Sequence, residues 1–134
     1  MIPAKYTCDG EDINPPLFIK EVLEGVRSLV LIFDDPDSPT GNWVHWVVIN
    51  ISPSVSLIEE NSAPQGAIEG MNDFGKNSYG GPCPGSGVHG YFFKLYALDR
   101  MFELEPSVRK EDVEKAMEGA ILDYVELVGV YERQ

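Results

Sequence analysis

Two apolar segments joined by an acidic, proline-containing loop decide the fold: Ser28–Phe33 (SLVLIF) and Trp43–Ile51 (WVHWVVINI), separated by Asp34–Gly41 (DDPDSPTG). Each segment is a run of large aliphatic or aromatic residues of strand length, which is typical of a buried β-strand. The loop between them contains prolines and a glycine, residues that end strands and form turns. The pattern therefore predicts two buried strands connected by a rigid loop.

The rest of the chain adds two further strands and one helix. Val88–Leu98 (VHGYFFKLYAL) and Glu126–Glu132 (ELVGVYE) have the apolar character of strands. A helix is predicted between them, with Ser107 as its N-cap and acidic residues in its first turns. Its apolar stripe consists of Val113, Ala116, Met117, Ala120 and Ile121. Because strands dominate without a regular strand–helix alternation, we expect a mainly β fold: an antiparallel sheet or sandwich with a peripheral helix.

The composition favours a single small domain. The chain has 134 residues, of which 43% are hydrophobic, so we expect one domain over residues 1–134 with an ordinary core. Ten basic and 22 acidic residues give a net charge of −12, which argues against nucleic acid and against unaided docking on anionic membranes. No apolar run reaches the length of about 18 residues that membrane insertion needs. The first ten residues lack a signal pattern, so the cytoplasm is the expected compartment.

The two cysteines, Cys8 and Cys83, are too few for a fold built on disulfides. Their spacing and the lack of clustered histidines argue against a metal site, and we predict no cofactor. A nucleophilic Cys83 would need a strand-turn-helix elbow that the sequence does not contain. Pairing with Cys8 and burial as a free thiol are the two remaining interpretations.

The chain has two histidines, His45 and His89, and both lie on predicted strands. Strict alternation places His45 on one face with Trp43 and Val47, and His89 on one face with Tyr91. Because both strands are apolar on both faces, we expect both imidazoles to be buried and to need hydrogen-bond partners. An imidazole and a phenol on one face can hold an anionic oxygen together. The alternative is that all three residues are ordinary core positions.

Two rigid loops contain further candidates. Asp35 and Asp37 flank Pro36, where the prolines restrict the backbone and can hold a carboxylate in a fixed direction. A carboxylate beside an imidazole favours the protonated ring, whereas the alternative interpretation is two turn-forming aspartates. The second loop, GGPCPG at residues 80–85, contains Pro82 and Pro84 and could present backbone N–H groups to an anion.

Together these motifs resemble those of the phosphatidylethanolamine-binding protein family, also called Raf kinase inhibitor proteins, in particular its short bacterial and archaeal branch. Five blocks carry the resemblance in order: YTCDGEDINPPL (6–17), DDPDSP (34–39), NWVHWVVINI (42–51), GMNDFGKNSYGGPCPGSGVHGYFFKLYALD (70–99) and ELVGVYER (126–133). The resemblance implies a β-sandwich of antiparallel sheets with a small surface pocket for phosphate-like groups, including phospholipid head groups. Mapped by motif, the pocket residues are Asp35, Asp37, His45, Pro82, Pro84, His89 and Tyr91.

Two departures from the family pattern limit what can be transferred. Many relatives have arginine between the histidine and tyrosine of the GxHxY motif, where this chain has Gly90. By alternation this position points away from the pocket. The short branch also lacks the C-terminal extension of animal members, so the partner contacts of those longer proteins are not carried over.

From the residues and the resemblance we expect a binding module for a small anion or phosphoryl head group rather than an enzyme. In this module His45, His89 and Tyr91 would donate hydrogen bonds to an anionic oxygen. The resemblance also suggests a regulatory role, with a kinase or a serine protease as partner, and a homodimer. The alternative is a phosphoester-processing enzyme that uses the same histidines and aspartates for acid–base chemistry.

Overall fold

The two strands expected from the apolar runs form the centre of the fold. In the computed structural model, which describes residues 1–133, β2 (Ser28–Asp35) pairs antiparallel with β3 (Trp43–Ile51). All of β2 is buried, and so is β3 after Trp43. The prediction that the loop begins at Asp34 is wrong, because Asp34 and Asp35 are the last two residues of β2. Asp34 Oδ2 lies 3.1 Å from Lys94 Nζ and 3.0 Å from Lys110 Nζ, and the Asp35 carboxylate is hydrogen-bonded within the site described below.

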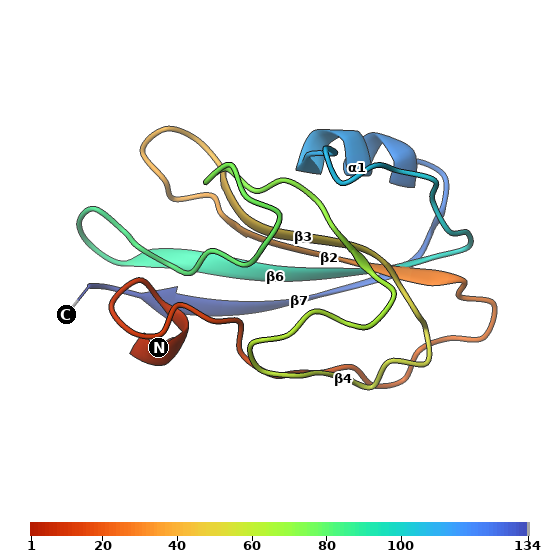
Figure 1. Ribbon diagram of the computed structural model, residues 1–134, viewed down its shortest axis with the longest axis horizontal. Coiled ribbons are helices and arrows are strands. Elements are labelled where there is room, and N and C mark those ends of the chain that lie inside the picture. Colours follow the sequence, from red (N-terminus) through yellow and green to blue (C-terminus); the bar gives the residue numbers. More distant parts are fainter. Residues whose placement is uncertain (134) are drawn as a thin grey trace.

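Five strands form the main sheet in the order β5-β3-β2-β6-β7, with every neighbouring pair antiparallel. The other members are β6 (His89–Leu98) and the two edge strands, β5 (Ile68–Glu69) and β7 (Ile121–Tyr131). A second sheet consists of β1 (Leu17–Phe18) and β4 (Leu57–Ile58), and a short 3₁₀ helix, η1, covers Ala4–Tyr6. Figure 1 shows the β4 segment on one side of the main sheet and helix α1 (Lys110–Met117) on the other. The expected mainly β, antiparallel architecture is confirmed.

The core has two parts, one on each face of the main sheet. One apolar cluster, which includes Phe33, Trp46 and Ile58, lies between the main sheet and the small sheet. The other cluster includes Val47 and Met117 and lies beneath α1. The main sheet is therefore covered on both faces, which explains why its central strands are apolar throughout rather than alternating.

The helix is shorter than the apolar stripe predicted. It begins at Lys110 rather than after Ser107, and the Asp112 carboxylate accepts the backbone N–H of Arg109 at 3.0 Å. It ends at Met117, and Gly119 then adopts a φ of +77°, which turns the chain out of the helix. Ile121 is the first residue of β7, so this strand starts earlier than the predicted Glu126.

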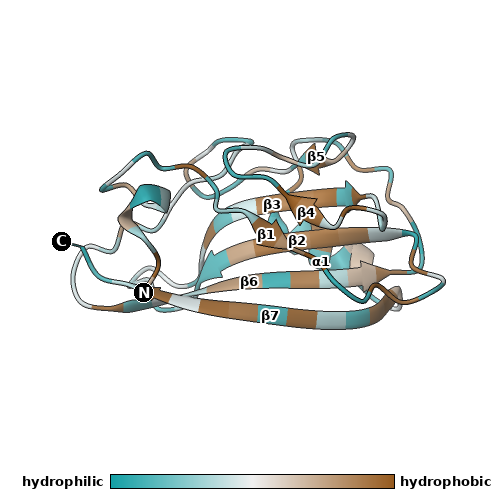
Figure 2. Cartoon of the chain, turned by 90° about the horizontal axis from the view of Figure 1, so that it is seen from below, coloured by the Kyte–Doolittle hydropathy of each residue, from teal (hydrophilic) through white to brown (hydrophobic). Residues whose placement is uncertain are grey.

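Strand β7 is an open edge of the sheet. Its partner is β6 on one side, and Figure 2 shows apolar colour along much of its length. The exposed apolar side chains are Ile121, Leu122, Tyr124, Val125, Leu127, Val128 and Val130. The N-terminal segment covers the end of the strand, where the Ile2 backbone N–H donates to the Val130 carbonyl at 2.8 Å. Within residues 1–133, no helix has the length and apolar character needed to cross a bilayer.

Candidate functional site

A β-bulge in β3 sets the direction of His45. Phe33 of β2 pairs with Trp46 of β3, and the next residue, Asp34, pairs with Val44. His45 is therefore an extra residue in β3 without a partner position in β2. Beyond the bulge the alternation is reversed: Trp46 packs with Phe33, whereas Val47 packs on the helix side. The prediction that His45 shares a face with Val47 is therefore wrong. Bulges of this kind redirect side chains next to binding sites.

The bulge lies beside a surface cavity of about 180 Å³. Among the residues predicted from the sequence, the cavity lining includes Asp35, His45, Pro84, His89 and Tyr91. Asp37 and Pro82 do not line it. The lining also includes residues that the sequence reasoning did not assign to the site: Ser38, Pro39, Trp43, Phe74, Cys83 and Gly85. Of these, Trp43 could have been found, since it belongs to the same Trp-x-His motif as His45.

A chain of hydrogen bonds through the loop after β2 orients His89. Asp35 Oδ2 lies 2.7 Å from His89 Nδ1, and Asp35 Oδ1 accepts the backbone N–H of Asp37 at 2.7 Å. Asp37 Oδ2 in turn accepts the backbone N–H of Gly90 at 2.7 Å. Because a carboxylate accepts hydrogen bonds, Nδ1 of His89 carries a proton and Nε2 is the nitrogen that can meet a ligand. Asp37 therefore stabilises the loop and the strand that hold His89, without lining the cavity itself.

The position of Gly90 bears on the departure from the family pattern. A Cβ atom at this residue would lie 3.3 Å from Asp37 Oδ2, so a side chain there would start beside that carboxylate. In this chain that carboxylate accepts the backbone N–H of Gly90. The hydrogen-bond chain that orients His89 is thus complete without an arginine.

His45 is held through the rim loop. Its Nδ1 lies 2.6 Å from the Gly80 carbonyl oxygen, and the Gly80 N–H donates to the His45 carbonyl at 3.0 Å. Since a carbonyl oxygen accepts, Nδ1 donates and the neutral ring presents an Nε2 lone pair. Burial lowers the pKa of His45, and the opposing effects of the Gly80 hydrogen bond and of Asp35 are smaller. His45 is therefore neutral at pH 7 and gains a second donor only at lower pH.

Two buried donors of the cavity lining have no protein partner. The Tyr91 hydroxyl and Trp43 Nε1 form no hydrogen bond within residues 1–133. Burial, and to a lesser extent the charges of Asp35 and Asp37, raise the pKa of Tyr91, so its hydroxyl keeps its proton at neutral pH. An unpaired buried donor costs about 1–3 kcal/mol. A ligand that accepts hydrogen bonds from both groups would recover this free energy.

Aromatic rings support the site from the core. Phe33 stacks on Phe93 with ring centroids 3.8 Å apart, and it lies 5.5 Å from the His45 ring and 6.1 Å from Tyr91. On the outer side, the Phe74 ring lies 5.3 Å from His45 in an edge-on arrangement. The imidazole of His45 is thus fixed by rings on both sides as well as by its hydrogen bond.

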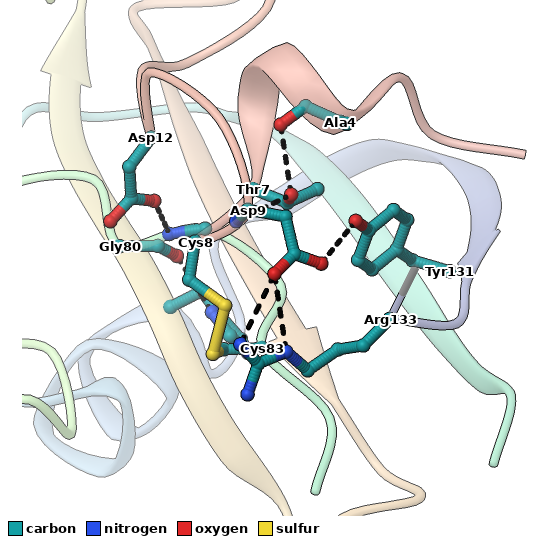
Figure 3. The surroundings of a disulfide bond; sticks show 11 residues. Ala4, Thr7, Cys8, Asp9, Asp12, Gly80, Cys83, Tyr131 and Arg133 are labelled. Atoms are coloured by element: carbon teal, nitrogen blue, oxygen red, sulfur yellow. Dashed lines mark hydrogen bonds and ion pairs between the residues drawn. A yellow bond between two sulfur atoms is a disulfide. The ribbon is translucent and has the colours of Figure 1, made fainter. Parts of the chain in front are cut away.

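A disulfide between Cys8 and Cys83 ties the rim loop to the N-terminal segment, as Figure 3 shows. The Cys8 N–H also donates to the Pro82 carbonyl at 3.1 Å, and the Gly81 N–H donates to Asp12 Oδ1 at 2.7 Å. Of the two interpretations left open by the sequence, pairing is therefore the correct one. Pro82 is buried in this junction and supports the rim rather than lining the cavity.

The fold and the pocket together define a small β-rich binding module. The chain belongs to the phosphatidylethanolamine-binding protein family, whose family model matches residues 1–132. A UPF0098 protein of Methanothermobacter thermautotrophicus is 52% identical, with 98% of this chain and 91% of that protein covered. A UPF0098 protein of Pyrococcus horikoshii is 51% identical, with 99% and 71% covered.

Solved structures agree with this assignment. A phosphatidylethanolamine-binding protein homolog from Chlamydia trachomatis has a TM-score of 0.95 at 43% identity, with 99% of this chain and 90% of that chain covered. YbcL of E. coli, described as a member of the mammalian family, has a TM-score of 0.87 at 31% identity, with 95% and 84% covered. The resemblance inferred from the sequence motifs is confirmed.

Proposed function

We propose that the cavity binds a small phosphate-like anion, either inorganic phosphate or the phosphoryl part of a phospholipid head group. The observation that carries this proposal is the pair of unpartnered donors, Tyr91 and Trp43, in a cavity that also contains both imidazoles. Anionic oxygens accept short, strong hydrogen bonds, so such a ligand would satisfy both donors.

The protonation state of His45 favours a phosphoryl group that keeps one proton. At neutral pH its Nε2 is an acceptor, because Nδ1 donates to Gly80 and burial lowers the pKa of the ring. A phosphate monoester such as O-phosphorylethanolamine has a second pKa of about 6, so a fraction of it carries a P–OH donor near neutral pH. That donor pairs with Nε2, while the remaining oxygens accept from Tyr91 and Trp43.

The proposal is tested by NMR titration of ¹⁵N-labelled protein with inorganic phosphate and, separately, with O-phosphorylethanolamine. We expect saturable shifts at His45, His89 and Tyr91 with both ligands. If neither ligand shifts these signals at millimolar concentration, the assignment of the pocket to phosphate-like anions is wrong. A difference in affinity between the two ligands measures what the ethanolamine part adds.

Tyr91→Phe separates binding from stability. We expect affinity for phosphate to fall by roughly three- to tenfold, the value of one net hydrogen bond, without loss of stability, because the hydroxyl has no protein partner. Isothermal titration and urea unfolding measure the two effects. Tyr124→Phe is the matched control: its hydroxyl bonds Glu126 outside the cavity, so phosphate affinity should not change. Unchanged affinity in Tyr91→Phe would remove this residue from the site.

Binding should depend on pH through His45. The pKa of His45 is lowered from the ordinary value near 6.5, so the ring is neutral at pH 7. At lower pH the ring takes up a proton and its Nε2 becomes a hydrogen-bond donor. Sulfate keeps its charge over the range and carries no proton, so its affinity should rise as pH falls, by up to about tenfold per pH unit. The rise should be shallower for phosphate, which already pairs with the neutral ring. A flat sulfate profile, or one that His45→Ala leaves unchanged, contradicts this role.

An enzymatic role is the second candidate, and the Asp35–His89 pair is the observation that favours it. A carboxylate 2.7 Å from Nδ1 can orient an imidazole for proton transfer. Turnover of a chromogenic phosphoester that is lost in His89→Ala would support this candidate. Tight phosphate binding without turnover would support the binding module.

A regulatory role stays a prediction from the family resemblance, with a kinase or a serine protease as the partner. The expected homodimer also stays a prediction, and its measurement is the molar mass by light scattering.

A further inference from the structure

We propose that the Cys8–Cys83 disulfide is a redox-controlled clamp on the pocket, so that its reduction by a dithiol lowers the affinity for the anion. The inference rests on the proposed function, because its readout is binding in the same cavity. It adds a regulatory input that neither the family membership nor the pocket geometry supplies.

The disulfide is accessible from the side of the cavity. Cys83 is exposed and belongs to the cavity lining, and Cys8 is half-buried. Gly85, two residues after Cys83, lies in an open part of the rim, where an added Cβ atom would meet nothing within 4 Å. A reductant can therefore approach Cys83 from solvent without unfolding the protein.

The rim loop connects the disulfide directly to His45. The Gly80 carbonyl that fixes the His45 tautomer lies only three positions before Cys83 in the chain. Residues 83–85 form part of the cavity wall itself. A displacement of Cys83 therefore changes the shape of the cavity wall close to His45.

The Cys8 side of the clamp is the more firmly anchored one. The neighbouring Asp9 accepts the Tyr131 hydroxyl at 2.6 Å, and it accepts two Arg133 nitrogens at 3.2 Å each, as Figure 3 shows. The base of the rim loop is also held, because the Gly81 N–H donates to Asp12 at 2.7 Å. Reduction therefore loosens the tip of the loop around Cys83 and leaves the sheet intact.

The chemistry balances with an external dithiol as the reductant. A thiolate of the dithiol attacks Cys83 Sγ, the bond between the two protein sulfurs breaks, and Cys8 leaves as a thiolate that takes up a proton. The second thiol of the reductant then forms its own disulfide and releases Cys83. Two electrons and two protons pass to the protein. The chain has two cysteines in total, so no third protein thiol can rearrange the bond.

The test compares phosphate affinity of the oxidised protein with that of protein reduced by dithiothreitol, with the redox state verified by mass after thiol alkylation of a parallel sample. We expect a roughly tenfold weaker affinity after reduction, about the value of one strong hydrogen bond. NMR should report changed backbone signals at Cys83 and Gly85, the part of the cavity wall that reduction loosens. The double variant Cys8→Ala/Cys83→Ala should bind as weakly as the reduced protein and should not respond to dithiothreitol.

Met117→Ala controls for general destabilisation, since Met117 lies in the cluster beneath α1, away from the cavity lining. It should lower stability but keep phosphate affinity. The proposed redox clamp is contradicted if the oxidised and reduced proteins bind phosphate equally well. It is also contradicted if Met117→Ala weakens phosphate binding as much as reduction does. If neither redox state binds phosphate, the proposed function fails and the clamp fails with it.

Discussion

Replacing both disulfide cysteines, as Cys8→Ser with Cys83→Ser, is expected to lower the free energy of unfolding by about 4 kcal/mol. The two residues are 75 positions apart, so the bond closes more than half of the chain into one loop. In the chain-entropy account, the cross-link restricts the unfolded state, and this restriction grows with the logarithm of the loop length. The loss is large beside the 5–15 kcal/mol that typical domains have in total.

Urea unfolding at equilibrium measures this effect. The wild-type protein in excess dithiothreitol provides the matched control, because it removes the same covalent bond without changing any side chain. If the variant and the reduced wild type lose the same free energy of unfolding, the loss comes from removal of the cross-link. A change below about 1 kcal/mol in both would contradict the expectation and would mean that the hydrogen bonds of the rim maintain the loop by themselves.

Phe33→Ala is expected to lower the free energy of unfolding by about 3–5 kcal/mol and to weaken anion binding as well. The side chain is fully buried and stacks on Phe93, with His45 and Tyr91 packed around the same ring. Removing it leaves a cavity directly behind the pocket, so the imidazole and the phenol lose the packing that fixes their positions.

Urea unfolding and phosphate titration of the same sample measure the two effects together. Phe33→Leu is the matched control, since it keeps most of the apolar volume and should cost clearly less than Phe33→Ala. Val30→Ala tests the opposite face of the same strand, where the side chain packs on the helix side. It should destabilise the protein without an equal loss of affinity. Equal binding losses in Phe33→Ala and Val30→Ala would show that packing behind the pocket has no special role.

The pocket combines two kinds of support that these predictions separate. His45, His89 and Tyr91 come from strands of the main sheet, and the core determines where these strands lie. The rim from Gly80 to Gly85 is a loop whose position depends on hydrogen bonds and on the disulfide. Substitutions in the part of the core directly behind the pocket should therefore change stability and affinity together, whereas changes at the rim should affect affinity even where the sheet stays intact.

Several features of the site could be predicted from local sequence. His89 and Tyr91 share a face, as alternation requires, because the register of β6 against β7 is regular in this segment. The burial of both imidazoles also follows from the apolar residues that surround them in the chain. The helix was predicted at the right place but with the wrong ends, since the stripe through Ile121 ignored the turn at Gly119.

The sequence by itself determined the central strands β2 and β3, because their apolar runs are buried on both faces of a covered sheet. It also determined the family, because five motifs occur in the right order. Only the tertiary structure decided the direction of His45, the pairing of Cys8 with Cys83, and the supporting rather than lining roles of Asp37 and Pro82. Each of these depends on residues far apart in the chain: on a strand register, on a loop crossing, or on a backbone group of another element. Local pattern does not contain such contacts, since they form only when the sheet brings those segments together.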